Sequence, residues 1–291
     1  MNVIDRLMAD HDKDPAAAAH ELRELDPLSL SLDTTPRYSW LLNHVLGELD
    51  GTWADACERQ QRIAALPDAS PTIHRNHAIA ALYAGQPLQA WHAQARFMAA
   101  SGASETEAQA VIRLGVLQHS PDRESSGENF LSALRGALEQ IKQWNGPNAV
   151  AAMLGAALNN VVSGWMNHAA EPSAPINDVM QEAAVRCQAM WQAGGTWVNA
   201  ERACYLRALV ANHLGHWTQA RDAAAEGLKL IDSHGEEDVD RAFLLLELAR
   251  AHGGLSQATQ QQQARETAVA LAQAFSEPGL REWFDSKLVG A

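Results

Sequence analysis

Lysine, cysteine and long apolar runs are all scarce in this sequence. Only four of the 291 residues are Lys, and 22 Lys and Arg stand against 35 Asp and Glu, which gives a formal net charge of -13. Because a protein that holds a phosphate backbone needs a basic face, this balance excludes nucleic acid as a partner. Three cysteines are an odd number and make no disulfide framework. No run of about 18 apolar residues could span a bilayer, and the N-terminus lacks signal-peptide character, so we expect a cytoplasmic protein without membrane contact.

Motifs that carry enzyme chemistry are also missing. The sequence contains no glycine-rich phosphate loop and no Gly-x-Ser-x-Gly nucleophile turn. Cys57, Cys187 and Cys204 lie in Ala-rich helical surroundings without an adjacent base, so we expect them to act as small buried hydrophobes rather than as nucleophiles. The sequence therefore predicts no enzyme activity, no catalytic residue and no cofactor.

Histidine pairs suggest metal ligands but are incomplete. His74 and His77 are three residues apart, as are His213 and His216, which places two ligands on one helical face. Neither pair has an obvious third ligand. We therefore expect surface or groove histidines and no metal site.

An acidic cluster near the N-terminus resembles a calcium loop only in part. Asp10, Asp12, Asp14 and Glu21 match positions 1, 3, 5 and 12 of such a loop, but Pro15 occupies the position where the loop needs Gly. Asp14 followed by Pro15 instead predicts the start of a helix, with Asp as its N-cap.

Alanine and helical periodicity dominate what is present. Ala accounts for 54 residues, and nine of the seventeen aromatic rings belong to Trp. Ala favours helices but fills little core volume. In the segment 148–168 the larger apolar residues recur every three or four positions and so describe one face of a helix; they are Val150, Leu154, Leu158, Val161, Val162 and Trp165. Strand alternation is almost absent, so the sequence predicts an all-α fold.

A short pattern recurs along the chain. Gly51-Thr-Trp-Ala-Asp-Ala56 is followed 34 residues later by Gly85-Gln-Pro-Leu-Gln-Ala90, and the outline returns at Gly215-His-Trp-Thr-Gln-Ala220 and at Gly253-Gly-Leu-Ser-Gln-Ala258. Gly suits a helix end that needs a left-handed backbone, and Ala lets the next helix approach closely. The pattern resembles the inter-helix turn of the tetratricopeptide repeat family, whose repeat is a 34-residue helix pair. The 38-residue spacing of the last two turns is similar to that of relatives in bacterial regulators.

This resemblance implies a right-handed superhelix of antiparallel helix pairs in one continuous domain. It also implies that Trp53 and Trp217 fill the wedge between paired helices. By this interpretation the chain divides into five parts. They are capping helices at 1–35, two repeats at 36–104, atypical helical pairs at 105–196, two repeats at 197–277, and a C-terminal capping helix at 278–291.

In this family the first helices of successive pairs line a concave surface that binds ligand. The family's ligand-facing positions, with a polar stripe on segment 148–168, give our candidate peptide- or partner-binding residues: Arg75, Asn76, Tyr83, Asn160, Asn167, Arg202, Tyr205 and Asn212. The same alignment places Asp240, Phe243, Leu244, Glu247 and Arg250 on that surface in the last repeat. Asn suits backbone amides, Arg suits carboxylates, and Tyr offers rigid contact area.

The resemblance implies a non-enzymatic scaffold or regulatory module that binds a protein or peptide in its groove. A second copy of the chain is a further candidate partner, through an apolar cluster of Trp283, Phe284 and Leu288 in segment 278–288. The alternative is a regulatory domain that senses a small molecule, with a pocket closed by the region 105–196.

Overall fold

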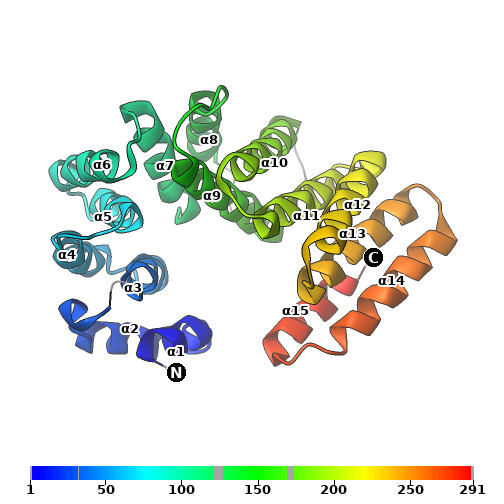
Figure 1. Ribbon diagram of the computed structural model, residues 1–291, viewed down its shortest axis with the longest axis horizontal. Coiled ribbons are helices and arrows are strands. Elements are labelled where there is room, and N and C mark those ends of the chain that lie inside the picture. The colour runs from blue at the N-terminus through cyan, green and yellow to red at the C-terminus, as the bar shows by residue number, and fades with distance from the viewer. Residues whose placement is uncertain (1, 32, 121–126, 169–173, 290–291) are drawn as a thin grey trace. The chain divides into compact units, whose positions relative to one another are not determined.

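The structure is a computed structural model of residues 1–291, and it describes all of them except residues 1, 32, 121–126, 169–173 and 290–291. The described residues form helices and contain no strand, which confirms the all-α prediction (Figure 1). In chain order the elements are α1 Val3–Asp10, α2 Pro15–Glu24, η1 Pro27–Ser29, α3 Thr35–Leu41, η2 Leu42–Leu49, α4 Trp53–Ala64, α5 Pro71–Tyr83, α6 Pro87–Ser101, α7 Glu105–Gln118, α8 Glu128–Gln140, α9 Asn148–His168, α10 Ala174–Gly194, α11 Trp197–His213, α12 Trp217–His234, α13 Asp238–Gly254, α14 Ala258–Ala272 and α15 Pro278–Leu288.

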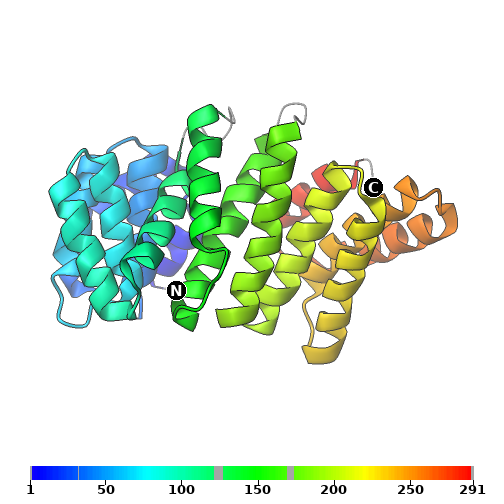
Figure 2. The same cartoon turned by 90° about the horizontal axis from the view of Figure 1, so that it is seen from above.

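The chain divides into two compact units. The first unit comprises Met1–Arg123 and Glu139–Val150, and the second comprises Glu124–Leu138 and Ala151–Ala291. Within each unit, consecutive helices pack as antiparallel pairs: α5 with α6 in the first unit, and α11 with α12 and α13 with α14 in the second (Figures 1 and 2). Helix pairs of this kind are what the tetratricopeptide resemblance implies.

Glycines at three of the four predicted turns adopt the left-handed backbone. The φ angle is 71° at Gly51, 69° at Gly85 and 72° at Gly215. A side chain at such an angle is strained, whereas Gly adopts it freely. These three turns are therefore confirmed.

The fourth turn lies three residues later than predicted. Gly253 is inside α13, and Ser256, with a φ angle of 60°, holds the left-handed position instead. The N–H of Gln257 closes this turn on the carbonyl of His252 at 2.9 Å. The alignment at Gly253 is therefore wrong, and the last two turns are further apart than the 38 residues it implies.

Tryptophan packing explains why α13 continues through two glycines. Trp217, the first residue of α12, lies against Gly254, where a Cβ would collide with the indole ring. In the first unit Trp53 has the same place after its turn and stacks on Tyr83, with ring centroids 4.2 Å apart. Tyr83 and Gly254 each lie two residues before a turn residue, which supports Ser256 as the true turn position.

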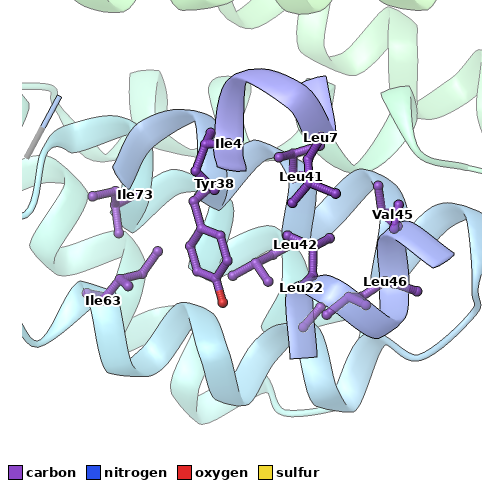
Figure 3. Close-up of a cluster of buried hydrophobic side chains, with 14 residues drawn as sticks. Ile4, Leu7, Leu22, Tyr38, Leu41, Leu42, Val45, Leu46, Ile63 and Ile73 are labelled. Carbon is purple, nitrogen blue, oxygen red and sulfur yellow. The ribbon is translucent and has the colours of Figure 1, made fainter. Parts of the chain in front are cut away.

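The two N-terminal helices contribute to the core of the first unit. Ile4 and Leu7 of α1 and Leu22 of α2 are buried together with Tyr38 of α3 (Figure 3). The predicted start of α2 is confirmed, because the side chain of Asp14 accepts a hydrogen bond from the N–H of Ala17 at 2.9 Å.

The apolar face predicted for segment 148–168 is confirmed in α9. All six residues of that face have no exposed surface: Val150, Leu154, Leu158, Val161, Val162 and Trp165. Among the described residues, α9 is the one helix long and apolar enough to cross a membrane by length and composition, and half of the stretch Asn148–Met166 is buried within the protein. Its large side chains pack inside; Trp165, for example, meets Phe130 edge-on with centroids 5.9 Å apart. The burial of this face identifies α9 as a core helix.

The C-terminal helix α15 uses most of its apolar cluster within the second unit. Phe284 is fully buried and contacts Phe243 and Phe275, with ring centroids 5.6 and 5.8 Å away. Leu288 packs against the same core, whereas Trp283 remains 44% exposed. Only one of the three residues expected to drive self-association is therefore available at the surface.

The cysteines are buried and free, as predicted. Burial raises the pKa of Cys57 to about 11 and that of Cys204 to about 12, and it also raises the pKa of Cys187. Thiols with such pKa values stay protonated and serve as small core side chains.

Candidate ligand-binding groove

Helix α11 presents three of the candidate residues on one face. Arg202, Tyr205 and Asn212 are spaced by three and seven residues, which aligns them along the helix. The helix begins at a capping box, in which the N–H of Thr196 donates to the Asn199 side chain at 2.9 Å and the N–H of Asn199 donates back to the Thr196 hydroxyl. This cap holds the start of α11 firmly.

A cavity of about 280 Å³, here called the Tyr205 cavity, opens along this face. Arg202 lies in its wall and donates from Nε to Asp240 Oδ2 at 2.9 Å. Tyr205 meets Phe243 edge-on, with centroids 6.3 Å apart. The remaining lining residues come from α9, α11 and α15 and are Asn159, Ser163, Leu209, Trp283 and Lys287.

A buried acid lies beside the Arg202–Asp240 pair. Glu201 has no exposed surface, and its Oε1 is 3.7 Å from Arg202 Nε. Burial raises the pKa of Glu201 to about 9, and the neighbouring Asp240 carboxyl adds to the rise. Glu201 therefore keeps its proton at neutral pH. Sequence reasoning missed this residue, although its spacing of three and seven from the buried Cys204 and Ala208 marks an inward position.

A second and larger cavity, here called the Asn212 cavity, has a volume of about 520 Å³. It lies between α11 and α13 and is bounded by Trp217, with Met166 of α9 and Gln261 of α14 at its edges. Leu209 lines both cavities, so they adjoin along α11. We call the two together the α11 groove.

A buried polar cluster forms one wall of the Asn212 cavity. Asn212 Nδ2 donates to the backbone oxygen of Glu247 at 2.8 Å and to its Oε2 at 2.9 Å. Arg250 donates to the other carboxyl oxygen of Glu247 and to the carbonyl of Lys287. Burial raises the pKa of Glu247, while Arg250 and Asn212 oppose the rise. Asn212 Oδ1 is buried without a hydrogen-bond partner among the described residues.

The candidates of the first unit are occupied by internal bonds. Asn76 is 3% exposed; its Nδ2 donates to Ser39 Oγ at 2.9 Å, and its Oδ1 accepts from Arg75 Nε and Nη2 at 3.1 and 2.9 Å. Burial lowers the pKa of Arg75 to about 10. The Tyr83 hydroxyl donates to the carbonyl of Val116 at 2.7 Å. These hydrogen bonds all lie within the first unit.

An asparagine amide joins consecutive first helices in each unit. Asn43 Nδ2 donates to the backbone oxygen of Asn76 at 3.0 Å, just as Asn212 Nδ2 donates to that of Glu247. The two donors stand at different repeat positions, because Asn43 lies eight residues before Gly51 and Asn212 lies three residues before Gly215.

The polar stripe predicted on α9 meets the Tyr205 cavity at Ser163, next to Asn159. Asn160 is exposed and accepts from Asn159 Nδ2 at 3.3 Å, whereas Asn159 itself lines the Tyr205 cavity. Asn167 belongs to α9, but its side chain lies outside the described residues.

The four histidines of the two expected pairs have separate environments. His213 lines the Asn212 cavity, and His216 is exposed at the start of α12. His74 and His77 are each only 7% exposed, and burial lowers the pKa of both. The prediction of surface or groove positions is therefore confirmed for His213 and His216. It is wrong for His74, which is buried.

The groove therefore brings together Arg202, Tyr205 and Asn212 of the eight candidates. Glu247, Arg250, Trp217 and Trp283 join them, and the first two were already expected on this surface. The arrangement offers hydrogen-bonding amides, an ion pair and aromatic walls, which suits non-covalent binding of an elongated polar ligand.

Comparison with known proteins finds no family model that matches the chain. No curated protein matches it either. Among solved structures, the apo form of RapI aligns with a TM-score of 0.48 at 9% identity, over 98% of this chain and 83% of that one. The apo form of the quorum sensor NprR from B. thuringiensis aligns with a TM-score of 0.34 at 14% identity, over 92% of this chain and 86% of that one.

The fold of this chain is established by its own helix pairs and turns. The pairs, the left-handed turn residues and the Trp that follows two of the turns are the features of the tetratricopeptide pattern. By these features the chain is a tetratricopeptide-like helical-repeat protein.

Proposed function

We propose that this protein is a non-enzymatic regulatory module of the cytoplasm that binds an extended peptide in the α11 groove. The observation that carries the proposal is the pair of adjoining cavities along α11, which share Leu209 and are lined by Arg202, Tyr205 and Asn212. A concave site with a few polar groups among apolar walls is typical of ligand binding.

The shape of the groove favours a peptide over a compact ligand. Its two cavities adjoin at Leu209 and follow the axis of α11, so an elongated molecule can occupy both at once. A peptide backbone presents N–H and C=O groups at regular intervals, which suits the polar side chains that line both cavities. Tyr205 and Trp283 would then pack on side chains at the other end.

A small-molecule ligand is the second candidate. The Asn212 cavity alone, at about 520 Å³, falls within the range of about 300–1,000 Å³ that is usual for small-molecule sites. This reading needs only the Asn212 cavity, whereas the peptide needs the Tyr205 cavity as well.

The test is a selection of random peptides on the full chain, followed by titration of a selected peptide against variants. Leu209→Trp fills the junction of the two cavities without removing a polar contact, and we expect it to abolish peptide binding. Asn212→Ala removes a polar side chain from the wall of the Asn212 cavity, and we expect binding at least tenfold weaker. Asn160→Ala changes an exposed asparagine outside both cavities and serves as the matched control. Thermal denaturation checks that each variant remains folded.

Three outcomes decide between the candidates. Loss of binding in Leu209→Trp with unchanged binding in Asn160→Ala supports the peptide groove. If no peptide is selected but a metabolite raises the melting temperature of the wild type and not of Leu209→Trp, the small-molecule reading is correct. Peptide binding that survives in Leu209→Trp contradicts both.

A further inference from the structure

Two histidines and an aspartate converge near the N-terminus of the first unit. His11 follows the last residue of α1, Asp12 comes next, and His44 lies on η2, an element continuous with α3, against which α1 packs (Figure 1). His11 Nε2 is 3.4 Å from Asp12 Oδ1, and His44 Nε2 is 3.7 Å from the same oxygen. The three atoms all lie within 4.8 Å of one another.

The opposite nitrogen of each imidazole is held by an acceptor. His11 Nδ1 is 3.0 Å from the carbonyl oxygen of Leu7, and His44 Nδ1 is 2.9 Å from Glu48 Oε2. A carbonyl and a carboxylate can only accept, so both Nδ1 atoms carry the proton. A neutral ring then has its lone pair on Nε2, and both Nε2 atoms face Asp12.

The Nε2 atoms of both rings and Asp12 Oδ1 therefore converge on one space. With neutral imidazoles, lone pairs from all three residues meet there, which is repulsive. A divalent cation placed between the three atoms converts the repulsion into three ligand bonds. From this geometry we propose that His11, Asp12 and His44 bind a zinc ion.

Distances and ligand chemistry suit zinc. Zinc binds imidazole nitrogen at about 2.0–2.1 Å and carboxylate oxygen at about 2.0–2.2 Å, so the ligand atoms of a tetrahedral site lie about 3.3 Å apart. The two observed separations, 3.4 and 3.7 Å, need little adjustment to reach that geometry. Three protein ligands leave the fourth position of the tetrahedron open for water or another ligand.

Neighbouring residues support the two imidazoles. Glu48, which holds His44, also accepts from His119 Nδ1 at 2.8 Å, so the carboxylate is also held by the residue that follows α7. Histidine ligands of zinc commonly donate to a carboxylate or a backbone carbonyl in this way, and the partner orients the ring. Trp40 stacks on His44 with centroids 4.8 Å apart and meets His11 edge-on at 5.4 Å, which makes an aromatic wall.

Burial and access are also appropriate. The side chains of His11 and His44 are 8% and 20% exposed, whereas that of Asp12 is 78% exposed. The two imidazoles are thus held in place, and the aspartate side leaves a path for the ion from solvent. Because His11 directly follows α1 and η2 carries His44, a bound ion would tie the end of the N-terminal helix to the first repeat.

Trp40 provides a direct readout for the experiment. The full chain, prepared without a histidine tag and treated with a chelator, is titrated with Zn²⁺ by calorimetry and with Co²⁺ by visible absorption. We expect one ion per chain with a dissociation constant in the micromolar range or below, tetrahedral Co²⁺ absorption bands, and quenching of Trp40 fluorescence by Co²⁺ that is lost in Trp40→Phe.

Variants with matched controls identify the ligands. Asp12→Ala changes an exposed side chain and should weaken binding at least tenfold, and His44→Gln should abolish it. Glu48→Gln should weaken it about 10–100-fold, because the orienting carboxylate is lost. Asp10→Ala and His20→Ala alter exposed residues close in sequence that are not ligands, and they should bind as the wild type does.

The outcomes are distinct. No calorimetric signal and no Co²⁺ absorption in the wild type would overturn the proposal. Equal binding by Asp10→Ala and Asp12→Ala would overturn it as well. The site lies in the first unit, so its test is independent of peptide binding in the α11 groove.

Discussion

Substitutions at positions 253 and 256 test the assignment of Ser256, rather than Gly253, as the left-handed residue of the fourth turn. Ser256 has a φ angle of 60°, whereas Gly253 lies inside α13. We expect Ser256→Gly to stabilise the protein and Gly253→Ala to leave its stability unchanged or raised. Gly215→Ala, at a φ angle of 72°, should destabilise it.

The magnitudes follow from backbone energetics. A left-handed conformation costs a residue with a side chain about 1–2 kcal/mol, and the extra freedom of glycine in the unfolded chain offsets about 0.4–1 kcal/mol of that. Ser256→Gly should therefore gain about 0.5–1 kcal/mol, and Gly215→Ala should lose a similar amount. In a helix Ala is favoured over Gly by about 0.5–1 kcal/mol. A Cβ at Gly253 would lie 2.8 Å from the amide nitrogen of Gln261, a partly exposed side chain that can move aside.

Urea denaturation followed by far-UV circular dichroism measures all three variants against the wild type. If Gly253 were the turn residue instead, Gly253→Ala would lower the stability and Ser256→Gly would not raise it. If Gly253→Ala destabilises the protein as much as Gly215→Ala does, while Ser256→Gly changes nothing, the corrected turn is refuted.

Three further predictions address the core and the buried ionisable groups. Phe284→Ala should cost about 3–5 kcal/mol in urea denaturation because the ring is fully buried, while Trp283→Ala, at a 44% exposed position, should cost clearly less. The pKa of Glu201 is raised from 4.5 to about 9, so the unfolded chain releases this proton at a lower pH than the folded protein does. The free energy of unfolding should therefore fall as pH rises from about 4.5 to 9. In melting curves recorded across this pH range, Glu201→Gln should flatten that dependence. Because burial raises the pKa of all three cysteines, a thiol reagent should label none of them rapidly in the native protein and all of them in urea; rapid labelling of native Cys57 would contradict this.

Local patterns predicted the helices well because they report burial directly. All six apolar residues chosen for the buried face of segment 148–168 are fully buried in α9, since their spacing alone defines one side of a helix. The turns at Gly51, Gly85 and Gly215 were recognisable for a similar reason, because a left-handed residue strongly favours Gly. Ser256 was missed because it is a non-glycine residue in that conformation. The nearby Gly253 and Gly254 drew the alignment, but they belong to α13, where Gly254 makes room for Trp217.

Contacts between distant segments could not be read from the sequence. Family positions placed Asn76 and Tyr83 on a binding surface, but Ser39 and Val116 occupy their polar atoms. His11 and His44 belong to different helices, and no local spacing connects them. The packing of α1 against α3 helps to bring both rings to Asp12.

The Asn212 cavity depends on the same register that the fourth turn defines. With Ser256 as the turn, the ligand-facing positions of α13 include Glu247, Arg250, Gly253 and Gly254, and all four line the cavity. The register based on Gly253 instead places Leu244 there, a residue fully buried in a core cluster with α11 and α12. In the first unit the position of Gly254 is held by Tyr83, whose ring stacks on Trp53. Because glycine leaves that space empty, Trp217 can lie flat against the backbone of α13 and form the cavity wall, so a side chain at position 254 would displace the indole and reshape the groove.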